Sequence, residues 1–213
     1  MKKVMVILAV LVIAAAAQAE LLGTWTFSGG VSTFAQEDGA ANIDQITVSE
    51  LTRVSLGTPS TTANQFASNT WGVEGNGVQL TVTVGAGYEI AGAVLSVGGL
   101  NGSNTGPSTL QWSLNGTDVG DAWTVAYSSA SSLAPDVALG TIAAGDNTLF
   151  LRSTGGTVNG GTGTPPTSGS VRLHTSLTLD GTIQTASPVP EPATMSLLGL
   201  GALAMVLRRK LRK

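Results

Sequence analysis

The clearest structural signal in the chain is the stretch Val78-Gln79-Leu80-Thr81-Val82-Thr83-Val84. Its apolar residues occupy every second position, with Gln or Thr between them. Successive side chains of a β-strand point to opposite faces, so this alternation predicts a strand with one face in a core and the other in water. The next residues, Gly85-Ala86-Gly87, predict a turn.

Similar short runs lie on both sides of this strand. We expect further strands at residues 21–28, 44–51, 88–97, 109–114, 121–127, 137–142 and 148–152, and either one long strand or a strand pair at 170–183. Loops are expected at 58–70, 100–107 and 153–168. Asn115-Gly116 and Gly145-Asp146-Asn147 are predicted to close two hairpins, because Asn and Gly accept the backbone angles of tight turns. No clear helical periodicity competes with this pattern. The spacing favours an all-β domain, an antiparallel β-sandwich of jelly-roll type.

The first 19 residues have the pattern of a signal peptide. Lys2 and Lys3 precede an apolar run that extends to about Ala16, and Ala17-Gln18-Ala19 is a small-x-small cleavage site. We therefore expect an N-terminal signal helix, export through the Sec translocon, and cleavage by signal peptidase before Glu20. The alternative is an uncleaved membrane anchor.

A second apolar run, Ala193–Leu207, lies near the other end and contains no charge. As a helix it would span about 22 Å, somewhat less than the roughly 30 Å hydrocarbon core, and snorkelling basic side chains would supply part of the difference. The run predicts a single transmembrane helix. An amphipathic helix packed on the domain is the alternative, but the run has no polar face. Five basic residues follow it and should stop transfer and stay on the cytoplasmic side: Arg208, Arg209, Lys210, Arg212 and Lys213.

The strip Val189-Pro190-Glu191-Pro192 stands directly before this run, and its prolines keep it extended. The proline-rich strip, the apolar helix and the basic end occur in the order of the PEP-CTERM protein-sorting signal, which they resemble. The resemblance implies a bacterial protein whose Pro-Glu-Pro box is recognised by exosortase, a membrane peptidase-transferase, in an organism that makes exopolysaccharide.

These features divide the chain into three parts. They are a signal peptide at 1–19, an exported domain at 20–187 and a sorting signal at 188–213, with its box at 190–192, its transmembrane helix at 193–207 and its basic tail at 208–213. The exported domain has three arginines, no lysine and twelve carboxylates, a net charge of −9. Nucleic-acid binding is excluded, since phosphate contacts need a basic face. Without cysteine, no disulfide can hold the fold.

Few residues suggest chemistry. His174 is the single histidine and alternates with apolar neighbours as an outward-facing strand residue, and no Gly-x-Ser-x-Gly elbow accompanies it. Glu74 and Glu89 lack any flanking motif that would mark paired catalytic carboxylates. Residues 115–121 carry oxygen ligands for Ca²⁺ but do not match an EF-hand loop. We therefore expect neither an enzyme nor a cofactor, with Ca²⁺ as the alternative.

A sugar site would need an exposed aromatic ring. Trp25, Trp112 and Trp123 alternate with polar residues and are expected in the core, whereas Trp71 stands at a loop edge and is the candidate for a sugar contact or a plug of the sandwich end. Residues 66–183 resemble galactose-binding-like or lectin-like sandwiches in four short motifs: Gly87-Tyr88, Thr105-Gly106-Pro107, Ser113–Gly116 and Arg172-Leu173.

Together these features predict a non-enzymatic exported protein, anchored first in the inner membrane and then sorted to the cell surface or the extracellular matrix. A structural or adhesive role is the first expectation. The alternatives are a carbohydrate-binding module that retains matrix polysaccharide and a glycan hydrolase.

Overall fold

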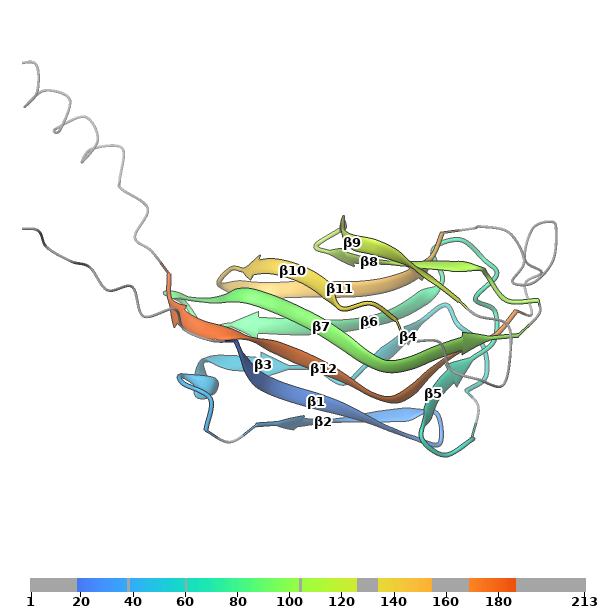
Figure 1. Cartoon of the computed structure of the whole chain (residues 1–213), viewed down its shortest axis with the longest axis horizontal. Coiled ribbons are helices and arrows are strands. Elements are labelled where there is room, and N and C mark those ends of the chain that lie inside the picture. The colour runs from blue at the N-terminus through green and yellow to red at the C-terminus, as the bar shows by residue number, and fades with distance from the viewer. Residues whose placement is uncertain are drawn as a thin grey trace, which may run out of the picture.

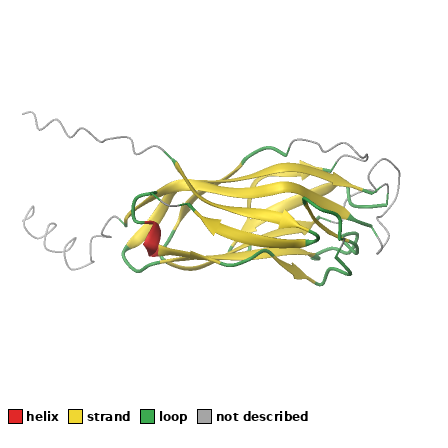
Figure 2. Ribbon diagram, turned by 90° about the horizontal axis from the view of Figure 1, so that it is seen from below, coloured by secondary structure: helices red, strands yellow, loops and turns green. Residues whose placement is uncertain are grey.

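The computed structural model describes residues 19–37, 39–59, 61–103, 105–125, 134–154 and 169–186. Within these ranges the chain forms two antiparallel sheets packed face to face (Figures 1 and 2). The predicted all-β sandwich is confirmed. The expected signal helix and C-terminal helix lie outside the described residues. Among the residues that are described, no helix has the length and apolar character needed to cross a bilayer.

The first sheet contains the two strands that begin and end the domain. Its order is β10 (Val137–Ile142), β7 (Tyr88–Gly102), β12 (Val171–Thr185), β1 (Glu20–Ser28) and β2 (Val31–Gln36). The short strand β5 (Gln65–Ser68) pairs with the start of β12, beyond the part that pairs with β1. β7 lies between β10 and β12 and is therefore an interior strand of this sheet.

The second sheet is built around the Val78–Val84 alternation. Its order is β3 (Ile46–Val48), β6 (Gly77–Val84), β11 (Gly145–Ser153), β8 (Thr109–Leu114) and β9 (Thr117–Thr124), and β4 (Thr52–Val54) also pairs with β6. A 3-10 turn, Ile43–Gln45, leads into β3. The β8–β9 hairpin at Asn115-Gly116 is confirmed, and both of these residues have positive φ.

The core lies between the sheets and consists of the alternate residues of each strand. On β6 the four residues at every second position are all buried: Val78, Leu80, Val82 and Val84. Trp25, Trp112 and Trp123 are also buried, as expected, and the last two rings pack edge to face with centroids 5.8 Å apart. Two indole N–H groups find backbone acceptors, Trp25 at Ser49 O and Trp123 at Pro135 O. Such pairing removes the cost of burying a polar group.

Several predicted boundaries were wrong. β5 lies inside the expected loop 58–70, β7 continues to Gly102 into the expected loop 100–107, and β9 begins at Thr117 rather than 121. These segments are short and lie next to residues such as Gly, Asn, Ser and Thr, so their sequence resembles a loop. Pairing with long neighbouring strands satisfies their backbone groups and extends the ladder.

The expected hairpin between residues 137–142 and 148–152 was also wrong. β10 pairs with β7 in the first sheet, whereas β11 pairs with β6 and β8 in the second, so the chain crosses between sheets here. The buried side chain of Asn147 holds the crossing: its amide donates to Ala143 O at 2.8 Å and to Gly145 O at 2.9 Å. Its oxygen accepts from Asn115 Nδ2 at 3.0 Å, which ties the crossing to the β8–β9 turn.

Asn147→Ala should lower the free energy of unfolding by about 1–3 kcal/mol, because it removes the hydrogen bonds that the buried Asn147 amide donates to Ala143 O, Gly145 O and Val82 O. Urea unfolding of the full chain in detergent micelles, followed by tryptophan fluorescence, measures the change. Thr141→Ala, an exposed site on β10, is the control. Equal midpoints for the two variants would contradict this account of the crossing.

Candidate functional site

Both ends of the domain leave the sandwich at the same place. β1 and β12 are antiparallel neighbours, and Glu20 pairs with Gly181. Figure 1 shows the end of β12 beside the start of β1, and β5 near the opposite end. We call the first the proximal end and the second the distal end. Arg172, near the start of β12, is roughly 40 Å from Thr185 at the rise of about 3.3 Å per strand residue.

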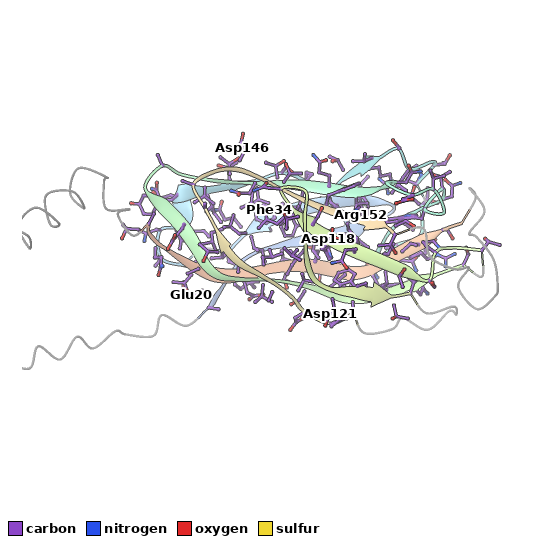
Figure 3. All side chains as sticks on the ribbon, turned by 90° about the horizontal axis from the view of Figure 1, so that it is seen from above. Glu20, Phe34, Asp118, Asp121, Asp146 and Arg152 are labelled. Carbon is purple, nitrogen blue, oxygen red and sulfur yellow. The ribbon has the colours of Figure 1, made fainter. Side chains whose placement is uncertain are left out.

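The predicted cleavage site borders the proximal end. Ala19 and Glu20 are exposed, and Glu20 is the first residue of β1 (Figure 3). The Glu20 carboxylate accepts a hydrogen bond from Ala41 N at 3.1 Å. The other predicted processing residues lie outside the described residues: Ala17, Val189, Pro190, Glu191, Pro192, Arg208, Arg209, Lys210, Arg212 and Lys213.

The structure corrects the expectation at Trp71. The ring is only 1% exposed and belongs to the core, so it offers no platform for a sugar. After β5 the chain turns back into the sandwich: Trp71 N donates to Gly169 O at 2.9 Å, and Asn76 Nδ2 donates to Thr70 O at 2.8 Å. A loop-edge position in the sequence could not reveal that this loop folds inward. The alternative of a plug fits the burial.

His174 lies on the outer face of β12 and is half-buried. Its Nε2 is 2.9 Å from Asn101 Oδ1, an acceptor on the neighbouring strand β7. Burial lowers the pKa of His174 below its usual 6.5, and the positive charge of Arg172 lowers it further. The ring is therefore neutral at pH 7, with Nε2 donating its proton to Asn101.

The 115–121 segment does not gather carboxylates. Arg152 Nη2 contacts both carboxylate oxygens of Asp118, at 2.7 and 2.9 Å. Figure 3 shows this pair together, with Asp121 and Asp146 at other places on the surface. Within the described part of the chain, no three His, Cys, Asp or Glu residues come together as metal ligands. Ca²⁺ binding here has no support from the geometry.

A pocket of about 300 Å³ opens at the distal end. Its polar lining consists of Thr58, Ser68, Asn69, Ser170 and Arg172, and Pro59 and Ala67 complete it. The sequence singled out Arg172 only as part of the Arg172-Leu173 motif. The available signal was the scarcity of cations, since Arg172 is one of three in residues 20–187.

Comparison with known families finds the PEP-CTERM protein-sorting motif at residues 188–210. No curated protein and no solved structure matches the chain. The chain therefore carries the PEP-CTERM sorting motif at this place, which confirms the resemblance seen in the sequence. The motif marks it as an exported surface protein that exosortase processes.

Trp71→Ala should destabilise the domain by about 3–5 kcal/mol, because it empties a large core site. Trp71→Phe should cost less than Trp25→Phe by about 1 kcal/mol. Trp25 Nε1 donates to Ser49 O, whereas Trp71 Nε1 has no partner among the described residues. Thermal unfolding by near-UV circular dichroism compares the variants. An unchanged midpoint for Trp71→Ala would mean that the ring is not in the core.

Proposed function

We propose that the sandwich is a non-enzymatic structural or adhesive domain of the cell envelope or extracellular matrix, displayed by its sorting tail. The observation that carries the proposal is the short connection between β12 and the sorting motif. β12 ends at Thr185 and the matched motif begins at residue 188. Pro190, the first residue of the Pro-Glu-Pro box, is five residues beyond Thr185, and that length of chain spans at most about 18 Å. The Pro-Glu-Pro box therefore stays close to the proximal end.

The proposed route follows from this connection. Signal peptidase cleaves before Glu20, residues 193–207 lodge in the inner membrane, and the basic residues after Leu207 arrest transfer. The sandwich then stands on the outer side of the membrane, with its distal end directed away from it. Exosortase acts at the box and transfers the protein to the surface.

The finer fold assignment is also part of the proposal. We assign the sandwich to the jelly-roll, galactose-binding-like type. The adjacency of the first and last strands, β1 and β12, in one sheet supports it. The pairing of strands that are distant in sequence, such as β7 with β12, also supports this assignment.

The absence of catalysis is inferred from the contacts of the groups that enzymes would use. The single histidine faces an amide oxygen rather than a hydroxyl nucleophile, and Asp118 is engaged by Arg152. Neither arrangement activates a nucleophile or holds a pair of catalytic acids.

Replacing Pro190, Glu191 and Pro192 together by Ala should abolish processing, because the recognised strip is lost. Mass spectrometry of the protein recovered from its native host measures the C-terminus: we expect the variant to retain Lys213 and the wild type to lose the residues after the box. Glu37→Ala changes an exposed carboxylate elsewhere and should be processed normally. A variant cut like the wild type would refute the proposed route.

The purified protein should release no reducing sugar, and no peptide, from cell-wall or matrix material. Product formation is followed over time with a glycan and peptide panel. Activity that co-purifies with the wild type and disappears in His174→Gln or Glu89→Gln would establish an enzyme and overturn the non-enzymatic proposal.

A further inference from the structure

We propose that the distal pocket binds a sugar that carries a carboxylate, a hexuronate unit, with Arg172 as the partner of the carboxylate. This goes beyond display at the surface, because sorting requires no ligand at the distal end. Four observations support this proposal: the contacts of Arg172 compared with those of the other two arginines, the space beside it, the hydrogen-bonded walls of the pocket and the chemistry of the pocket lining.

Arg172 differs from the other two arginines of the domain. Arg53 donates to Gly30 O and Ala67 O and stacks over the Phe66 ring at 4.0 Å, so it serves the core. Arg152 is paired with Asp118. Among the described residues Arg172 takes part in no ion pair or side-chain hydrogen bond, although it is only half-exposed. A guanidinium that has no such partner in the described part of a domain of net charge −9 is a candidate site for an anion.

The space beside Arg172 comes from the strand pairing. Arg172 lies directly opposite Ala67 on β5 and Asn101 on β7. Residues opposite one another in an antiparallel pair point to the same face. Ala67, with a single methyl group, leaves room next to the guanidinium on the β5 side, and the pocket occupies that side.

The pocket walls are fixed before any ligand arrives. On one side Ser68 Oγ donates to Gly57 O and Gly57 N donates to Thr70 Oγ1, both at 2.7 Å. On the other side Ser103 and Ser170 exchange two hydrogen bonds, Ser170 N to Ser103 Oγ at 3.1 Å and Ser103 N to Ser170 O at 3.0 Å. A preformed site avoids the entropy cost of ordering loops on binding.

The lining selects the ligand class. A guanidinium forms two parallel hydrogen bonds to a carboxylate. The hydroxyls of Thr58 and Ser170 and the amide of Asn69 suit the hydroxyl groups of a sugar ring. A peptide with a free C-terminus would also offer a carboxylate, but an apolar last side chain would find only Pro59 and Ala67 as apolar partners here. At about 300 Å³ the pocket is at the lower end of small-molecule sites, which fits one sugar ring.

The test uses the full-length protein in detergent micelles without a histidine tag. Glucuronate and galacturonate are titrated by calorimetry against glucose and galactose, their neutral counterparts. We expect binding of at least one uronate and at least tenfold weaker binding of its neutral counterpart. Arg172→Gln should weaken uronate binding about 10- to 100-fold. Arg152→Gln removes the same charge from a paired arginine and should leave binding unchanged.

His174 provides a second readout. It is the only histidine in the chain and stands two residues from Arg172 on the same face of β12, so its NMR signal needs no assignment. A carboxylate bound at Arg172 offsets the positive charge that lowers the pKa of His174, so saturating uronate should raise that pKa. Neutral sugars should not change it.

Folding is checked by circular dichroism. If Arg172→Gln does not fold, Asn69→Ala at the exposed pocket rim replaces it, and a severalfold loss is expected. Equal binding of neutral sugars and uronates, binding of an N-acetyl dipeptide in place of the uronates, or no uronate binding by the folded wild type would each overturn the proposal. None of these results depends on tail processing, so the two proposals fail separately.

Discussion

The pairing of β12 with its neighbours is the constraint on which the rest of the structure depends. β12 pairs with β7 over twelve residue positions, and its other edge pairs with β1 and β5. The last strand of the domain thus joins the first strand to the middle of the chain. The domain contains no cysteine, so this ladder and the apolar core beneath it must hold the sandwich together. Leu173, Leu177 and Leu179 are buried on its inner face.

This constraint links folding to export. The first sheet cannot be completed until β12 is available, because β1 and β5 both use it as their partner. Contacts between residues far apart in sequence form late and slowly. β12 is also the last strand before the sorting motif at 188–210. The strand that completes the sandwich is therefore followed almost at once by the tail that reaches the membrane.

Sequence reasoning succeeded where the pattern is local and one face is buried. The alternation of Val78–Val84, the Asn115-Gly116 turn and the burial of Trp25 are such cases. It failed where neighbours distant in sequence decide the outcome. Gln65–Ser68 becomes a strand only because β12 lies beside it, and Gly145 marks a reversal without showing that the chain changes sheets. The distal pocket was likewise hidden, because Asn69 and Arg172 meet only through the β5–β12 pairing.

The position of Arg172 and Thr185 on one strand has a mechanical consequence. A molecule held by its tail at one end and by a bound polymer at Arg172 would carry tension along β12. Antiparallel hydrogen bonds lie perpendicular to the strands, so a pull along the strand loads the ladders to β7, β1 and β5 in shear, many bonds at once. A pull across the strand would open the same bonds one after another. The domain would therefore be pulled along its strands, which is the direction in which a β-sheet best resists force.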